Sequence, residues 1–279
     1  MAAFTPASGK DALTNSEDGA YANARTTAVS YSLSCRSSLK LYRETGEQYV
    51  TKQGDTSLFQ LLSTCTTVLV SGHVSEEIVQ GAVAAKVYDL IPSSGGQSDR
   101  PLAFLPIYFT GLSSGNFWQQ LLCVIRNVLG LSLTREMQDA TAFMHERLQR
   151  CKLKYPNTEI RPLLMGHSMG ALFASYLSIK NGWLSLCLNP LGMGSGLRRQ
   201  VGEKNLKCVD GELQEQHLSI VMPHDCVAST ERFAFLRHVR TPGLVLVTKD
   251  YAKELELTSR SKIHNGQIAY LKKLLSPTA

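Results

Sequence analysis

The stretch Ile160-Arg161-Pro162-Leu163-Leu164-Met165-Gly166-His167-Ser168-Met169-Gly170 decides the fold. Its first half is an apolar run typical of a buried strand, and a helical pattern follows at once over residues 171–179. The sequence therefore predicts a strand, a sharp turn and a helix, with Ser168 at the apex. Gly166 and Gly170 fit such a turn, because larger side chains two residues from the serine would collide.

A serine at the apex of such a turn is lifted clear of the sheet, where its hydroxyl can reach a substrate. The N–H of Met169 lies at the start of the following helix, where it can face a developing oxyanion. We therefore predict Ser168 as a nucleophile, Met169 as an oxyanion donor and His167 as a residue that contacts substrate. The alternative is a glycine-rich turn between a buried strand and its helix, with no chemical role.

This motif and its flanking elements resemble the nucleophile turn of the α/β-hydrolase family. A loop of Pro and Gly at residues 189–196 and an Asp-x-Val sequence within residues 223–227 are similar to its class 3, fungal-type lipase branch. The resemblance covers roughly residues 100–270. It implies a mostly parallel central sheet flanked by helices, with a serine, an acid and a histidine in that chain order. It also implies catalysis without a metal or an organic cofactor.

The same resemblance places a second oxyanion donor in the loop after an early strand, here residues 110–113. The backbone of Gly111 and Leu112 is the expected donor, and the Ser113 hydroxyl is a side-chain alternative. Thr110 stands where members of the family carry histidine or arginine.

Two residues that flank this loop, Pro106 and Trp118, carry further predictions. Pro106 interrupts the apolar run of residues 102–109, which predicts a strand at the edge of a sheet or one with a bulge. Trp118, after the loop, is predicted to contact substrate. The structural alternative for the loop is a glycine turn that caps a helix starting at Asn116.

A serine hydroxyl needs a base at neutral pH, and the base needs an acid to orient it. His264 occupies the last position in the family order, in a predicted loop ahead of a predicted helix over residues 268–275. We therefore predict His264 as the base. His217 and His238 are predicted to be structural, and His224 is a residue that could line the site.

Two aspartates compete for the acid role. Asp225 follows a predicted strand over residues 218–222, and Asp250 follows a predicted strand over residues 243–248. Only residues 251–263 lie between Asp250 and His264, which is too short for a further strand and its helix. The spacing therefore favours Asp225 and keeps Asp250 as the alternative.

The remaining pattern is that of an α/β chain. Further strands are predicted at residues 66–70, 82–90 and 184–188, and a helix at residues 135–152. Residues 121–125 fit a strand or a helix end equally well. Residues 197–215 are polar and charged, and they are a candidate cap or lid segment or a surface connection.

The chain has 279 residues, of which 43% are hydrophobic and 19% charged, as in ordinary globular proteins. Residues 1–37 are rich in small polar residues and poor in large aliphatic ones, so we predict a disordered leader. Residues 38–279 are then predicted to form one domain. The oligomeric state cannot be read from the sequence.

Seven scattered cysteines with no Cys-x-x-Cys pair predict free thiols in the cytoplasm or another reducing compartment. The Ser/Thr-rich start allows an alternative, an exported effector without a cleaved signal peptide. The net charge of +6 is mild and permits peripheral contact with anionic lipid. No pattern indicates nucleic-acid binding or a transmembrane segment.

These patterns predict a serine carboxylic-ester hydrolase, with lipid esters as the first substrates to consider because of the lipase resemblance. Thioesters and small esters share the chemistry. The rival hypothesis is a catalytically inactive hydrolase-fold protein that binds a lipid, a small ligand or a protein partner, because a fold does not guarantee an activity.

Overall fold

The computed structural model describes residues 41–43, 57–93, 100–112, 116–211, 213, 216–222, 224–228, 234–236, 238–248, 259–266 and 269. The predicted disordered leader lies outside this described part. So does the predicted helix over residues 268–275, apart from Ala269, which is helical.

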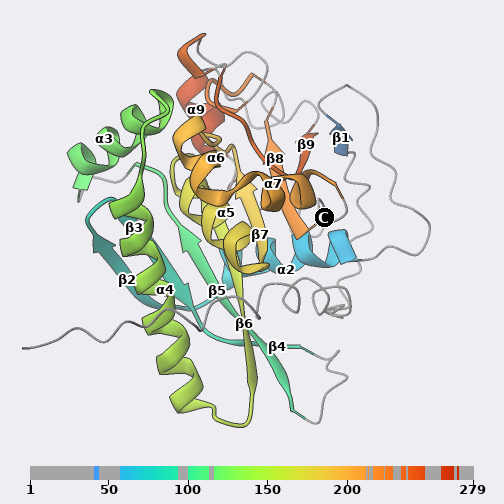
Figure 1. Cartoon of the computed structure of the whole chain (residues 1–279). Coiled ribbons are helices and arrows are strands. Elements are labelled where there is room, and N and C mark those ends of the chain that lie inside the picture. The colour runs from blue at the N-terminus through green and yellow to red at the C-terminus, as the bar shows by residue number, and fades with distance from the viewer. Residues whose placement is uncertain are drawn as a thin grey trace, which may run out of the picture.

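The described part of the chain is an α/β structure built on one mixed sheet of nine strands (Figure 1). The strands follow the spatial order β1-β9-β8-β7-β6-β5-β3-β2, and β4 pairs with β5 beside this path. Strands β5 to β9 are neighbours and run parallel, while β1, β2, β3 and β4 join in antiparallel pairs. The predicted mostly parallel sheet is therefore present at its centre.

The strands are β1 (Leu41–Arg43), β2 (Val74–Gln80), β3 (Val83–Tyr88), β4 (Ile91–Ser93), β5 (Leu102–Phe109), β6 (Glu159–His167), β7 (Leu184–Leu188), β8 (His217–Val221) and β9 (Leu244–Thr248). The helices are α2 (Ser57–Ser71), α3 (Phe117–Val128), α4 (Thr134–Lys154), α5 (Gly170–Asn181), α6 (Ser195–Val201), α7 (Glu203–Asp210), the 3-10 helix η4 (Ala234–Leu236) and α9 (Arg260–Asn265).

Helices cover both faces of the sheet (Figure 1). Strand side chains alternate between the two faces, so Tyr108 of β5 packs in a buried cluster with α2, whereas Phe109 packs with α4 and α5. Helices α6 and α7 bury Leu197, Val201 and Val209 in the cluster around α5. The segment considered as a cap or lid is therefore packed against the core over its described residues.

Most predicted elements are confirmed within a few residues. These are the strands at 82–90, 102–109, 160–166, 184–188, 218–222 and 243–248, and the helices at 135–152 and 171–179. Gly182 ends α5 in a left-handed conformation, with φ 66°. The ambiguous residues 121–125 belong to helix α3.

The strand predicted at residues 66–70 is wrong, because these residues lie in helix α2. Leu61, Cys65 and Val68 recur at helical spacing and are buried against the sheet. The Thr66 hydroxyl donates a 2.6 Å hydrogen bond to the Leu62 carbonyl one turn earlier. Burial of one helical face therefore outweighs the strand preference of the β-branched residues.

The edge or bulge predicted at Pro106 is also wrong, because β5 is paired on both sides. On one side β4 pairs as far as Phe104, and β3 begins at Ile107. The Thr110 N–H donates to Ala84 of β3, so alternate residues, including Pro106, turn their nitrogens to that side. Proline therefore occupies the gap between two partner strands, where no ladder hydrogen bond is lost.

Two glycines bring the backbones of β6, α5 and β5 into direct contact. A Cβ added to Gly170 would lie 2.2 Å from the Phe109 carbonyl oxygen and 2.3 Å from that of Thr110. A Cβ added to Gly166 would lie 2.7 Å from the Ala171 Cα. The predicted collision of larger side chains at both positions is confirmed, and helix α5 can start only where these residues are glycine.

We expect Gly170→Ala to lower the free energy of unfolding by about 1–3 kcal/mol, because the methyl group forces α5 away from β5. Helix propensity alone predicts the opposite, a gain of up to about 1 kcal/mol. Chemical denaturation of both proteins measures the sign. An alanine variant as stable as the parent, or more stable, would contradict the close approach.

Candidate functional site

Ser168 occupies the apex of the turn between β6 and α5, as the sequence predicts. Its φ is 54°, a left-handed conformation that non-glycine residues rarely adopt. The Ser168 N–H donates to the Leu188 carbonyl at 3.0 Å, and the Ser168 carbonyl accepts from the Leu191 N–H at 3.1 Å. The end of β7 thus holds the strained turn, and the serine side chain is half-buried.

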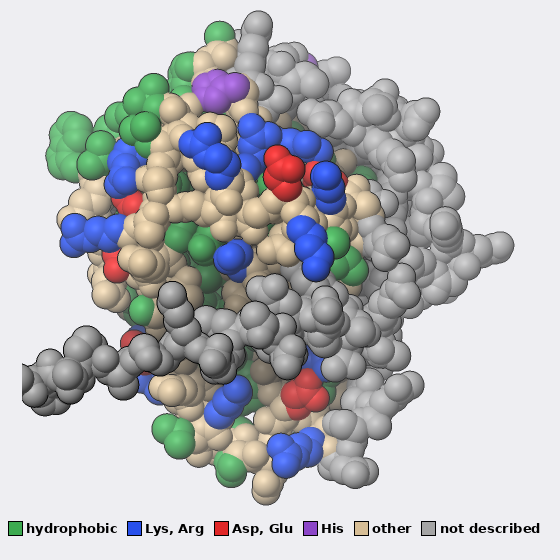
Figure 2. All heavy atoms as spheres, viewed as in Figure 1, with side chains coloured by type: hydrophobic (Ala, Val, Ile, Leu, Met, Phe, Trp, Pro, Cys, Tyr) green, Lys and Arg blue, Asp and Glu red, His purple; other side chains and the backbone are tan. Residues whose placement is uncertain are grey.

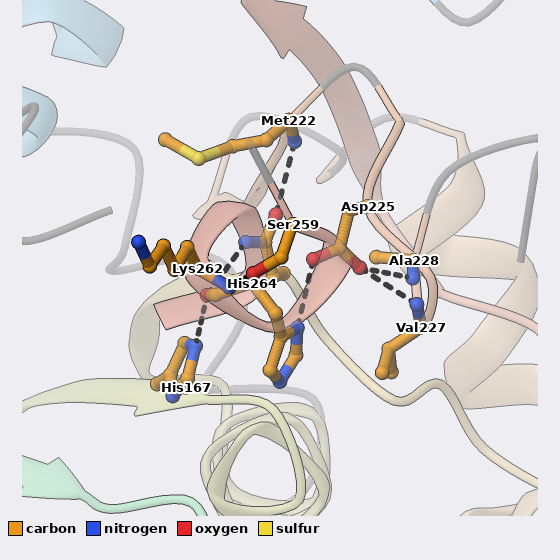
Figure 3. A network of polar contacts seen from close by, with 9 residues as sticks. His167, Met222, Asp225, Val227, Ala228, Ser259, Lys262 and His264 are labelled. Carbon is orange, nitrogen blue, oxygen red and sulfur yellow. Dashed lines mark hydrogen bonds and ion pairs between the residues drawn. The ribbon is translucent and has the colours of Figure 1, made fainter. Parts of the chain in front are cut away.

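Asp225 and His264 are in direct contact beside this turn (Figure 3). His264 Nδ1 lies 2.8 Å from Asp225 Oδ2. The Asp225 side chain is 0% exposed, and its other oxygen accepts hydrogen bonds from the backbone N–H groups of Val227 and Ala228 at 2.8 and 2.7 Å. Because Nδ1 donates to the carboxylate, Nε2 is the nitrogen of His264 that can accept a proton.

His264 lies in helix α9, so the loop predicted around it is wrong. The cause is a local cap: the Ser259 side chain accepts a 3.2 Å hydrogen bond from the Lys262 N–H (Figure 3). Serine at a helix N-cap satisfies one of the free donors of the first turn. His264 lies near the end of this short helix, so its backbone conformation is fixed by the helix.

The backbone carbonyl of His264 is held by two side chains. His167 Nε2 donates to it at 2.9 Å and Asn189 Nδ2 at 3.1 Å. Asn189 Oδ1 in turn accepts from the Met222 N–H at 2.9 Å. Asn189 is buried, and its φ is 42°. Asn189 follows β7 and Met222 follows β8, so one amide fixes two strand ends to the helix that carries His264.

Sequence reasoning missed Asn189. The available signal was its position: a polar residue directly after a buried parallel strand, at the same edge of the sheet as Ser168.

The His167 ring packs on the His264 ring, with 4.7 Å between their centroids. Burial, followed by the nearby His264, lowers the pKa of His167 to about 4. His167 is therefore neutral at pH 7, with its proton on the nitrogen that donates to His264. Its predicted contact with substrate stays a prediction.

The loop after β5 lies against the serine. A Cβ added to Gly111 would lie 3.2 Å from Ser168 Cβ and 3.2 Å from His167 Nδ1. Met169 is the N-cap of α5, where the first N–H groups have no partner within the helix. Gly111 and Met169 therefore lie beside Ser168, and the oxyanion roles of Gly111, Leu112 and Met169 stay predictions.

Of the other predicted site residues, Trp118 and His224 are exposed and two lie outside the described part of the chain. Trp118 is 78% exposed in the first turn of α3, where its ring contacts Phe117. Ser113 and the alternative acid, Asp250, lie outside the described residues. Ser168 and His264, both described, share no hydrogen bond. His224, with φ 62°, is exposed beside Asp225.

His217 and His238 lie away from Ser168. His217 is buried with its Nδ1 2.9 Å from the Ser178 hydroxyl and 3.2 Å from that of Ser185. Burial lowers the pKa of His217 to about 3. His238 is exposed, and its Nε2 donates to the Val128 carbonyl at the end of α3. These contacts agree with the structural roles that the sequence predicts.

The six described cysteines are free thiols, four of them buried. Within the described ranges, no group of three His, Cys, Asp or Glu side chains is placed to hold a metal ion. Among the helices that the structure describes, none combines the length and the apolar character that crossing a bilayer requires. The chain matches no protein-family model, no curated protein and no solved structure.

We expect Asn189→Gly to lower the free energy of unfolding by about 1–3 kcal/mol, because the buried Met222 N–H loses its acceptor. Glycine keeps the left-handed backbone free of strain, so the variant isolates the amide contacts. Hydrogen exchange should also become faster in α9, since the His264 carbonyl loses one of the two side-chain donors that the described residues provide. Unchanged stability and unchanged exchange in α9 would show that the amide does not connect these elements.

Stability should fall as the pH drops below about 6.5. His167 and His217 have folded pKa values of about 4 and about 3, below the ordinary value of 6.5, so the unfolded chain binds protons first. Their contribution is complete above pH 6.5 and is lost as the pH falls toward the folded values, at about 1.4 kcal/mol per pH unit for each histidine.

Denaturation at pH 7.5, 6 and 5 measures this slope. His217→Gln should reduce this slope by the contribution of one histidine. His145→Gln, which changes an exposed histidine, should leave the slope unaltered. A parent protein whose stability is constant between pH 7.5 and 5 would refute the assignment.

Proposed function

We propose that the chain adopts an α/β-hydrolase fold and hydrolyses carboxylic esters through Ser168, Asp225 and His264. The observation that carries this proposal is the 2.8 Å contact between His264 and the fully buried Asp225, beside a serine in a strained turn. A buried carboxylate that binds one nitrogen of an imidazole leaves the other nitrogen as a base.

In the proposed reaction, His264 Nε2 takes the Ser168 proton while the serine oxygen attacks the ester carbonyl carbon. Asp225 keeps the imidazole in the required tautomer and stabilises its charged form. The N–H of Met169 and a donor from Gly111–Ser113 hold the oxyanion. His264 then protonates the leaving alcohol, and water repeats the cycle to release the acid.

The missing hydrogen bond between Ser168 and His264 is compatible with this reaction, since catalytic hydrogen bonds often form only when substrate is bound. The two hydrogen bonds to the His264 carbonyl, from His167 and Asn189, support the proposal further. The first of them ties the backbone of His264 to His167, the residue next to the proposed nucleophile.

Lipid esters, such as acylglycerols or phospholipids, are the proposed first substrates, by the resemblance to class 3 lipases. Thioesters and small esters use the same steps. The rival is an inactive hydrolase-fold protein that binds a lipid, a small ligand or a partner, and the missing Ser168–His264 hydrogen bond is the observation that favours it.

Labelling with a fluorophosphonate probe, read by peptide mass spectrometry, tests the proposal. We expect labelling at Ser168 that is abolished in Ser168→Ala and slowed about 10³-fold or more in His264→Ala and Asp225→Asn. Asp250→Asn serves as the matched acid control and should label at the parental rate. A reversed result for the two aspartates would assign the acid to Asp250.

A folded parent protein that remains unlabelled, both in buffer and with detergent micelles, would contradict the proposed hydrolase. The micelles matter because a lipid-like surface can open a site that is closed in water. That result would favour the binding protein.

A further inference from the structure

Helix α3 carries large apolar side chains on its exposed side as well as on its inward side, where the partly buried Val124 and Val128 pack on the core. Its fully buried residues are Gln120, Cys123 and Asn127, two of them with polar amide side chains. Its exposed side is apolar, at helical spacing. We call the exposed side the α3 stripe, and it consists of Trp118, Leu122, Ile125 and Leu129.

Burial of apolar surface normally sets how a helix faces its protein, so an outward apolar stripe has no explanation in folding. Such a stripe is typical of a surface that meets another apolar phase. Phe117 and Leu131, which are also exposed, extend it at the two ends. In Figure 2 apolar side chains gather over α3 at the upper left of the molecule.

The inward side of α3 is fixed by specific hydrogen bonds. Asn127 Nδ2 donates to the Gly192 carbonyl at 3.0 Å, and its Oδ1 accepts from the Gly194 N–H at 2.9 Å. A Cβ added to Gly194 would lie 1.8 Å from the Asn127 carbonyl oxygen, so the two backbones touch. The helix cannot rotate its stripe inward without breaking these contacts.

The surface beside the stripe is basic. Helix α6 lies next to α3 and exposes Arg199, and α7 exposes Lys204 and Lys207, with Glu203 as an exposed acidic neighbour. Figure 2 shows Lys and Arg side chains gathered over α6 and α7 on the same face as the apolar patch. The whole chain carries a net charge of +6. An apolar ridge beside a basic surface is complementary to an anionic lipid bilayer.

The stripe follows the loop of the candidate site along the chain. Leu112 is 47% exposed and follows Gly111, whose backbone lies against Ser168. Helix α3 begins at Phe117, five positions after Leu112. Trp118, the first residue of the stripe, therefore follows Gly111 by seven positions in the chain.

We propose that the α3 stripe docks this protein on the surface of an anionic phospholipid bilayer. The apolar side chains enter the interface, and the basic side chains of α6 and α7 face the headgroups. This inference deepens the proposed ester hydrolysis, on which its biological purpose rests, because it would bring lipid esters to Ser168. The docking itself needs no chemistry.

Vesicle flotation with the Ser168→Ala protein tests docking separately from hydrolysis. We expect binding to vesicles of phosphatidylcholine with phosphatidylglycerol, and weaker binding to pure phosphatidylcholine or at high salt. Leu122→Asp and Ile125→Asp should each weaken binding about tenfold or more, because a charge replaces a buried apolar group. Leu153→Asp is the matched control: Leu153 is 83% exposed at the end of α4, and its change should have no effect.

Several results would overturn the docking proposal. They are an absence of binding to anionic vesicles, equal loss in Leu153→Asp, or a dimer in solution that Leu122→Asp dissolves, since the stripe would then bind a second copy. Circular dichroism establishes that each variant is folded. Fluorophosphonate labelling of Ser168 in Leu122→Asp, which should match the parent in buffer, reports separately on the hydrolase.

Discussion

The contact of backbones at Gly166 and Gly170 is the constraint on which the rest of this structure depends. Only hydrogen atoms at these positions allow the end of β6, the start of α5 and the end of β5 to meet without side chains between them. That approach forces Ser168 into a left-handed conformation and places Gly111 against it. The parallel strands β5, β6, β7 and β8 then deliver their following loops to the same edge of the sheet.

A second layer of order comes from polar groups without access to bulk water. Asp225 is buried, and among the donors to its carboxylate in the described structure are two backbone N–H groups and His264. Asn189 uses both ends of its amide between Met222 and His264. Since buried polar groups that lose a partner are costly, each of these contacts helps to keep the others in place. His264 is thus held through its ring by Asp225 and through its backbone carbonyl by His167 and Asn189.

Much of this arrangement follows from sequence patterns that have a local cause. Buried strands appear as short apolar runs, and the glycines around Ser168 reveal the tight turn. Spacing along the chain favours Asp225 as the partner of His264, and the described structure brings these two residues together. In each case the decisive residues are close in sequence, or the order of strands limits the choice.

The loop predicted around His264 was wrong for a local reason, the cap at Ser259, whereas the other wrong or missing predictions have a tertiary cause. Residues 66–70 have the composition of a strand, but a helical face buried on the sheet decides their structure. Pro106 is tolerated in a central strand because β4 pairs with β5 before it and β3 pairs with the same edge of β5 after it. Asn189 gains its importance from Met222 and His264, and the exposed side of α3 depends on Asn127 being anchored elsewhere. None of these partners is visible in a local pattern.

The hydrogen bond between His167 and His264 has a consequence for the order in which the protein becomes complete. It joins residues 97 positions apart, whereas the contacts of the serine turn come from β5, β6, α5 and the residues that end and follow β7, all of which precede residue 192. A ribosome therefore finishes the turn long before it adds the helix that carries the imidazole. The hydrogen bonds to the His264 carbonyl therefore form only after the segment that carries His264 has been synthesised and has docked.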